Sequence, residues 1–344
     1  MNKKLLGSIA MILAGVGVYT YVRAQRNNHH SLVGETATSG HWTTEYMPDL
    51  TGKIIVVTGA NSGIGFEAAK EFARKGAQTI LACRNMDKAQ AAFAQIQTEI
   101  PHASAEIMRL DLASLSSVHQ FAAAFKTKYN RLNVLVNNAG LGGIPYSTTD
   151  DGFETQFGVN HLGHFALTGL LIDLLLKTPD ARVVNVSSGG HRFGNMDFDN
   201  LMYEGGKGYS VMGAYGRSKL ANLLFTYELQ CRLEAVGANC IAVAAHPGAS
   251  STNLGSHLEK DGWHMRLLLS TMGALAQSAA MGALPTLRAA VDSDVRGGDY
   301  YGSGGLMEAR GYPVKVQSNA ASHNTTDQRR LWDISQELVK VRYL

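Results

Sequence analysis

Short apolar runs alternate with longer mixed stretches along most of this chain of 344 residues. Runs of four to six residues rich in Val and Ile are typical of strands buried on both faces of a parallel sheet. We expect such strands at residues 54–57, 79–83, 107–110, 133–136, 182–186 and 240–244. Because helix-like stretches separate them, the pattern predicts an α/β fold with one doubly wound parallel sheet in a single domain.

The N-terminal region has a different pattern. Residues 5–22 form an apolar run of 18 residues without charge, between Lys4 and Arg23, just long enough to span a bilayer. We interpret residues 1–24 as an uncleaved N-terminal membrane-anchor helix, with a cleaved signal peptide as the alternative, because small residues follow the run. The polar residues 25–48 lack periodicity and predict a linker. The globular domain then covers residues 49–344.

Composition excludes some classes of protein. The net charge of +3 is small and no dense run of Lys or Arg occurs, so we expect no binding to nucleic acid. Three cysteines without C-x-x-C spacing predict neither a disulfide framework nor a metal site. They fit a reducing compartment, so we expect the domain to face the cytoplasm from its membrane anchor.

A glycine-rich turn follows the first predicted strand and precedes a predicted helix. Strand, glycine turn and helix in this order are typical of Rossmann-like dinucleotide binding, because glycines let the backbone approach the pyrophosphate at the helix N-terminus. The spacing is G-x-x-x-G-x-G, and no Lys follows the last Gly, which excludes a P-loop. A purely structural turn is the alternative. The cofactor-binding residues expected here are Gly59, Asn61, Ser62, Gly63, Ile64 and Gly65.

Arg84 ends the second predicted strand, nineteen residues after Gly65. Enzymes that use NAD commonly have an acidic residue near this place, whereas an Arg can pair with the 2′-phosphate of NADP. The sequence therefore favours NADP(H) over NAD(H), although an Arg at a strand end can also be an ordinary surface residue.

Tyr215 and Lys219 stand four residues apart at the start of an apolar stretch that predicts a helix, so they should share one helix face. A neighbouring ammonium favours the phenolate and would lower the pKa of Tyr215 toward neutral. Such a phenol can exchange a proton with an alcohol or carbonyl oxygen. Taken alone, the pair could equally be packing plus a solvated charge.

Together, the glycine turn, Asn137-Asn138-Ala139-Gly140 and Tyr215-x-x-x-Lys219 resemble the short-chain dehydrogenase/reductase family. Two further stretches, the long segment 191–213 and the C-terminal region around Trp332, resemble its retinol dehydrogenase branch. The resemblance covers residues 50–339, nearly the whole globular part.

The resemblance implies further site residues. Ser188, with Ser187 as the fallback, would hydrogen-bond the reacting oxygen, and Asn160 would hold a water beside Lys219. Asp111 would contact the adenine, although it could instead cap the helix that starts near Leu115. The other cofactor-binding residues implied by the family are Leu112, Asn138, Ala139, Gly140, Tyr215, Lys219, Pro247, Gly248 and Thr252. A plain turn is the alternative at Pro247-Gly248.

The expected function is therefore NADP(H)-dependent interconversion of an alcohol and a carbonyl. The anchor and the apolar segment 255–284 point to a lipophilic, retinoid-like or steroid-like substrate. That segment could be a lid over the site, core, a membrane contact or the contact of a homodimer. A carbon–carbon double-bond reductase resembling protochlorophyllide reductase, and a cofactor-binding protein without catalysis, stay open as alternatives.

Overall fold

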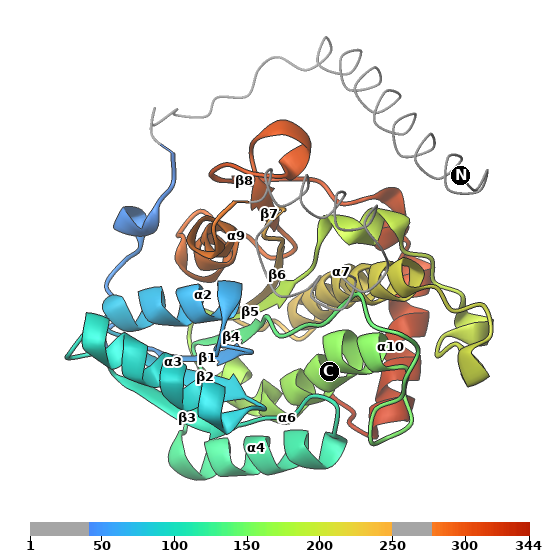
Figure 1. Ribbon diagram of the computed structural model, residues 1–344, viewed down its shortest axis with the longest axis horizontal. Coiled ribbons are helices and arrows are strands. Elements are labelled where there is room, and N and C mark those ends of the chain that lie inside the picture. Colours follow the sequence, from blue (N-terminus) through green and yellow to red (C-terminus); the bar gives the residue numbers. More distant parts are fainter. Residues whose placement is uncertain (1–40, 250–276) are drawn as a thin grey trace, which may run out of the picture. The chain divides into compact units, whose positions relative to one another are not determined.

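One sheet of eight strands organises the part of the chain that this computed structural model describes, residues 41–249 and 277–344. The strand order is β3-β2-β1-β4-β5-β6-β7-β8, and only the pair β7–β8 is antiparallel (Figure 1). The strands are β1 (Ile54–Thr58), β2 (Gln78–Cys83), β3 (Ala105–Arg109), β4 (Val134–Asn137), β5 (Ala181–Val186), β6 (Cys240–Ala245), β7 (Tyr300–Ser303) and β8 (Pro313–Lys315). The order reverses between β1 and β4, the place where open α/β sheets bind ligands.

Helices cover both faces of this sheet, which confirms the predicted doubly wound architecture. Within β1, Ile54 and Val56 pack into one hydrophobic cluster, whereas Ile55 and Val57 pack into the other. The first cluster includes side chains of α4 (Leu115–Lys128), α6 (Gly163–Lys177), α7 (Val211–Ala235) and α10 (Thr325–Val339). The second includes side chains of α2 (Gly63–Arg74), α3 (Met86–Glu99) and α9 (Ala279–Val291).

All six predicted strands are present, with ends that differ by one or two residues from the prediction. The sequence did not predict β7 or β8. β8 lies at the edge of the sheet and begins with Pro313, a position where a missing backbone N–H costs no ladder hydrogen bond.

The compact unit begins at His41, eight residues before the predicted boundary at Asp49. The reason is that Trp42 and Met47, on either side of the short helix η1 (Thr44–Tyr46), are buried in the cluster on the α2 side. The predicted anchor (residues 1–24), most of the predicted linker and Thr252 lie outside the described residues. Of the predicted apolar segment 255–284, only residues 277–284 are described, and Leu284 there belongs to the core.

A long helical stretch precedes β5 and contains a wider turn. It consists of α5 (Thr155–Phe157), the π-helical turn η2 (Gly158–Leu162) and α6. Among the described residues, this stretch of 23 residues is long and apolar enough to cross a membrane, but 72% of its most apolar window is buried inside the protein. It is therefore explained as a core helix. The short 3-10 helices are η3 (Gly189–Phe193), η4 (Phe198–Asn200), η5 (Glu204–Gly206), η8 (Leu306–Glu308) and η9 (Ala320–His323).

Candidate active site

Tyr215 and Lys219 lie on one side of α7, in its buried first half. Ser210 caps the helix by accepting a hydrogen bond from the backbone N–H of Gly213 at 3.2 Å. The Lys219 Nζ lies 5.8 Å from the centre of the Tyr215 ring and donates to the backbone oxygen of Val186, the last residue of β5, at 3.1 Å. The helix thus presents both side chains at the carboxyl end of the sheet.

The two serines that follow β5 have different surroundings. The Ser187 hydroxyl is buried and donates to the backbone oxygen of Lys219 at 2.8 Å, so it ties β5 to α7. The Ser188 side chain hydrogen-bonds the Tyr215 phenol and accepts the Gly190 N–H at 3.1 Å. A Cβ on Gly190 would lie 2.9 Å from the Tyr215 ring, so this close approach requires glycine. Of the two, Ser188 is the serine that faces the phenol.

Asn160 sits in the middle of the π-helical turn, fully buried. Its side-chain oxygen accepts the Leu141 N–H at 2.9 Å, and its amide nitrogen donates to the Leu141 oxygen and to the Ser218 hydroxyl, each at 2.9 Å. These bonds engage the whole side-chain amide. A Cβ on Gly140 would lie 3.2 Å from Lys219 Nζ and 3.3 Å from Asn160 Oδ1, so the Gly140 backbone packs closely against both groups.

Burial sets the protonation of the pair. It raises the pKa of Tyr215 above its ordinary value of 10, against the lowering effect of the Ser188 hydrogen bond. It also lowers the pKa of Lys219 to about 8. This differs from the predicted direction for the tyrosine, because the cost of removing the phenolate from water is the largest effect on its pKa.

The glycine turn fits a dinucleotide. Gly59 and Gly63 have φ of +68° and +59°, a backbone region that favours glycine. A Cβ on Gly65 would lie 2.5 Å from the Gly59 oxygen, which only glycine avoids. The Ser62 side chain precedes α2 without capping it, so the first amides of this helix are available to an anion.

The end of β4 is tied to the same turn. The backbone N–H groups of Asn138 and Ala139 both donate to the Thr58 hydroxyl at 2.9 Å, and the Asn138 side chain donates to the Thr58 oxygen at 2.8 Å. His164 then joins Thr58 to the helix that carries Asn160. Its Nε2 is 2.9 Å from Thr58 Oγ1, and its Nδ1 is 3.1 Å from the backbone oxygen of Asn160. Asn138 therefore has a structural task besides any contact with cofactor.

Arg84 is exposed directly after β2. Nearby, Lys88 of α3 lines a hollow of about 260 Å³ together with Asn61 and Ser62 of the glycine turn. The sequence reasoning missed Lys88. The sequence did contain a signal for Lys88. A cation in the first turn of a helix interacts unfavourably with the helix dipole, so its presence there indicates a role other than stabilising the helix.

Asp111 lies after β3, and its carboxylate accepts the Ala113 N–H at 3.0 Å. The alternative interpretation of Asp111 as a helix cap is wrong. Ser114 precedes α4 without a side-chain cap, and Asp151 from a distant loop accepts the Leu115 N–H at 2.8 Å. Leu112 is buried in the core beside Gly163.

The Pro247-Gly248 turn follows β6. Gly248 has a φ of +66°, and a Cβ there would lie 2.5 Å from the Ala309 oxygen, so the turn requires glycine. Gln277 donates to the Pro247 oxygen at 2.7 Å and holds the turn from the other side. The sequence reasoning also missed the charged neighbours of this turn, Arg192 and Glu308.

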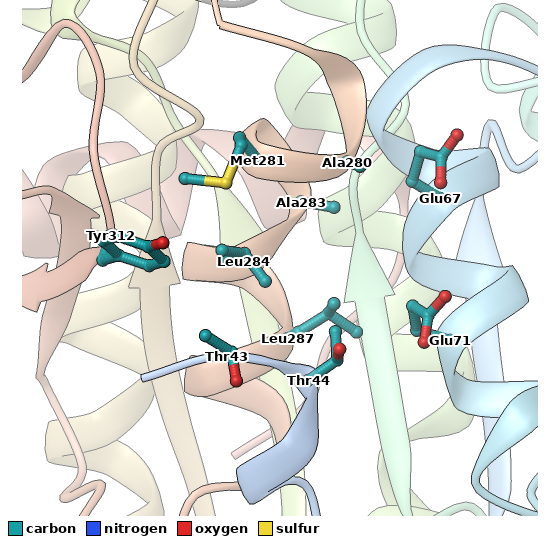
Figure 2. Close-up of a pocket in the computed structure, with 10 residues that line it drawn as sticks. All are labelled: Thr43, Thr44, Glu67, Glu71, Ala280, Met281, Ala283, Leu284, Leu287 and Tyr312. Carbon is teal, nitrogen blue, oxygen red and sulfur yellow. The ribbon is translucent and has the colours of Figure 1, made fainter. Parts of the chain in front are cut away.

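Another hollow, with a volume of about 290 Å³, lies elsewhere, between α2 and α9. Figure 2 shows Met281 and Leu284 of α9 on the side toward Tyr312, and Glu67 across from them on α2. None of its lining residues is Ser188, Tyr215 or Lys219. We therefore do not assign it to the reaction.

A glycine turn before α2 and a Ser–Tyr–Lys cluster at the carboxyl end of one doubly wound sheet define a class of protein. The chain belongs to the short-chain dehydrogenase family, whose family model matches residues 53–262. It is therefore an oxidoreductase with a nicotinamide-binding fold, similar to the retinol dehydrogenase branch. Retinol dehydrogenase 12 of Mus musculus is 40% identical over 296 residues, which cover 86% of this chain and 88% of that relative.

Solved structures agree with this assignment. The crystal structure of an uncharacterized protein from Mycobacterium paratuberculosis is 38% identical, with a TM-score of 0.73, covering 89% of this chain and 100% of the other. A short-chain dehydrogenase from Shigella flexneri, complexed with NADP, is 25% identical with a TM-score of 0.57, covering 74% of this chain and 98% of the other.

Proposed function

We propose that this protein interconverts an alcohol and a carbonyl group with NADP(H) as the hydride carrier. The observation that carries the proposal is the cluster of Ser188, Tyr215 and Lys219 at the carboxyl end of β5, next to Gly140 and the Asn160 amide. Two hydroxyl groups that share a hydrogen bond there can both reach one substrate oxygen.

When bound, the nicotinamide exchanges a hydride with the substrate carbon. The chain's own residues handle the oxygen. Ser188 donates a hydrogen bond to it and stabilises developing negative charge. Tyr215 exchanges a proton with it, and its raised pKa keeps the phenol protonated and ready to donate. Lys219, held by the Val186 oxygen, places a positive charge behind the phenol.

Two residues and one comparison support NADP(H) over NAD(H). Arg84 directly follows β2, the strand whose end usually meets the adenine ribose, and no acidic residue occupies its place. Lys88 lines the hollow beside Asn61, so two cations stand near the expected position of a 2′-phosphate. The complex of the Shigella flexneri relative with NADP is consistent with this choice.

The proposed substrate is lipophilic, of a retinoid-like or steroid-like class. Support comes from the apolar run at residues 5–22 and from the similarity to a relative named retinol dehydrogenase 12. We propose that residues 1–24 anchor the protein in a membrane, with the catalytic domain on the cytoplasmic side.

The test is Tyr215→Phe in the full chain. With a panel of aldehydes and alcohols, kcat should fall at least about 100-fold, because general acid–base catalysis contributes factors of this size. The NADPH dissociation constant, measured by its fluorescence, should stay within about threefold, since the change removes one oxygen atom.

Tyr227→Phe is the matched control. Tyr227 lies on the same helix and hydrogen-bonds Ser318 at 2.7 Å, away from Ser188 and Lys219. It should keep kcat. Full activity of Tyr215→Phe would disprove the assignment. A wild-type protein that reduces only carbon–carbon double bonds, or binds NADPH without any turnover, would instead support one of the two alternative functions.

A further inference from the structure

A half-buried carboxylate joins two segments that border the site. Glu308 accepts hydrogen bonds from Arg192 Nη2 at 3.1 and 3.0 Å, one to each oxygen. It also meets His246 Nε2 at 3.1 Å. The His246 side chain is 1% exposed and that of Glu308 13%. We call these three residues the Glu308 clasp.

The hydrogen bonds assign the protons of the clasp. The backbone N–H of Gly248 donates to His246 Nδ1 at 3.2 Å, so this nitrogen carries no proton. The ring proton is therefore on Nε2 and points at Glu308. Burial alone would raise the pKa of Glu308, but the hydrogen bond from His246 and the charge of Arg192 outweigh it and lower the pKa. The carboxylate is thus ionised and fully engaged at neutral pH.

The backbone around Glu308 is held in an unusual conformation. Met307 and Glu308 have φ of +54° and +58°, the left-handed region that non-glycine residues rarely adopt. Two consecutive residues of this kind persist only where surrounding contacts fix them. The clasp supplies such contacts, and the Ala249 N–H adds one by donating to the Ala309 oxygen at 2.7 Å.

The two partners of Glu308 lie beside functional positions. Arg192 belongs to η3, the turn that begins after Ser188. The neighbouring His191 contacts the backbone oxygen of Ser188 through Nδ1 at 2.6 Å. His246 directly precedes Pro247, in the turn at the end of β6. One carboxylate therefore connects the segment that carries Ser188 with the turn that the family places by the nicotinamide.

We propose that Glu308 is a positioning residue for the reaction. Resting on the proposed function, the inference is that the clasp fixes the Ser188 hydroxyl relative to the Pro247-Gly248 turn. The substrate oxygen then meets its hydrogen-bond donor while its carbon faces the hydride carrier. A misplacement of about 1 Å in such an arrangement can cost on the order of 100-fold in rate.

A double-mutant cycle tests this. In the full chain, Glu308→Ala should lower kcat by about 10- to 100-fold and change KM less than about threefold. Glu308→Gln, which keeps one acceptor oxygen, should lose less. In a Ser188→Ala background the further loss from Glu308→Ala should fall below about twofold, because the positioned hydroxyl is already gone. An equal loss in both backgrounds, or no loss from Glu308→Ala, would overturn the proposal.

A second variant and a second readout complete the design. Arg192→Met breaks the clasp from its half-exposed side and should reproduce the same non-additivity if Glu308→Ala does not fold. Amide hydrogen exchange should rise in residues 189–194 and 247–249 of both clasp variants. The control Lys126→Met removes a 2.7 Å surface ion pair between α4 and Asp173 of α6, and it should change neither kcat nor the exchange in these two segments.

The exchange measurement separates two failures. If the wild-type protein turns over no substrate, the proposed function fails, whereas faster exchange in both segments would still show that Glu308 couples them. Unchanged exchange together with additive rate losses would refute the clasp alone.

Discussion

At the scale of single residues, burial is the main cause of the unusual chemistry of Tyr215 and Lys219. Both groups become harder to charge: burial raises the pKa of the phenol and lowers that of the ammonium to about 8. A protonated phenol is the form that can donate to a carbonyl oxygen. A lysine with a pKa near 8 changes charge close to physiological pH, so small changes around it alter the field at the phenol.

Arg84 gives a residue-scale prediction about cofactor choice. Replacing it with Ala should reduce the preference for NADPH over NADH, measured as the ratio of kcat/KM values, by about 10- to 100-fold. This corresponds to the loss of a charge-assisted hydrogen bond to the 2′-phosphate. The value for NADH itself should change little.

Arg131→Ala is the control for that substitution. Arg131 is an exposed Arg that precedes β4 and donates to the Gly52 oxygen at 2.9 Å, at the other end of the sheet. Its removal should leave the cofactor ratio unchanged. If Arg84→Ala behaves like Arg131→Ala, Arg84 is an ordinary surface residue.

At the scale of elements, the site depends on how closely α2, β1 and β4 approach each other. Gly65→Ala should lower the free energy of unfolding by about 1–3 kcal/mol, because the added Cβ meets the Gly59 oxygen and the Asn138 amide. It should also abolish NADPH binding, since the turn must open to accept the methyl group. Urea unfolding and NADPH fluorescence measure the two effects.

The control for the helix itself is Arg74→Ala. Its side chain is 42% exposed at the last turn of α2, in a surface ion pair with Glu71. Such pairs contribute little, so its removal should change stability by less than about 1 kcal/mol and leave binding intact. Equal effects of the two variants would contradict a close-approach role for Gly65.

Elements differ in how far the sequence predicts them. β1, β2, β4, β5 and β6 are largely apolar runs that are almost wholly buried, a pattern visible in any short window. β3 is only partly buried, but Ile107 and Met108 still mark it in the sequence. β7 and β8 do not show this pattern. Four glycines, at positions 302, 304, 305 and 311, interrupt the C-terminal hairpin, and Pro313 starts its second strand. Their pairing depends on β6 and on each other rather than on local propensity.

At the scale of the whole molecule, three buried histidines predict how stability depends on pH. Burial lowers the pKa of His161 to about 3 and those of His164 and His191 to about 4, from an ordinary 6.5. The unfolded chain binds protons there that the folded protein cannot, so their stabilising effect is complete above pH 6.5 and is lost as pH falls toward 4. Each histidine contributes a slope of at most about 1.4 kcal/mol per pH unit.

Urea unfolding of the full chain at pH 7.5, 6.0 and 5.0 measures this slope, above the range in which most carboxyl groups titrate. His161→Gln should be less stable at pH 7.5 and should show a smaller slope, because glutamine has no proton to exchange. A free energy of unfolding that stays constant from pH 7.5 to 5.0 would disprove the prediction.

The distance along the chain between the members of a site decides which site residues can be predicted from the sequence. The glycine turn and the Tyr215–Lys219 pair are local, and their spacing alone predicts their neighbours. The choice between Ser187 and Ser188 needed coordinates, because adjacent residues after a strand point in different directions. The Glu308 clasp was out of reach: its partners stand 116 and 62 residues away in the chain.

The contacts of His164 determine which of its ring nitrogens carries the hydrogen. The backbone oxygen of Asn160 can only accept, so Nδ1 carries the ring's hydrogen and Nε2 is an acceptor for the Thr58 hydroxyl at 2.9 Å, shorter than the alternative contact of that hydroxyl with the Val136 oxygen at 3.3 Å. The hydroxyl oxygen keeps its lone pairs for the two amides that follow β4. The donors along this path therefore all point from the residues after β4 toward the π-helical turn that carries Asn160, so a continuous chain of hydrogen bonds connects these two segments.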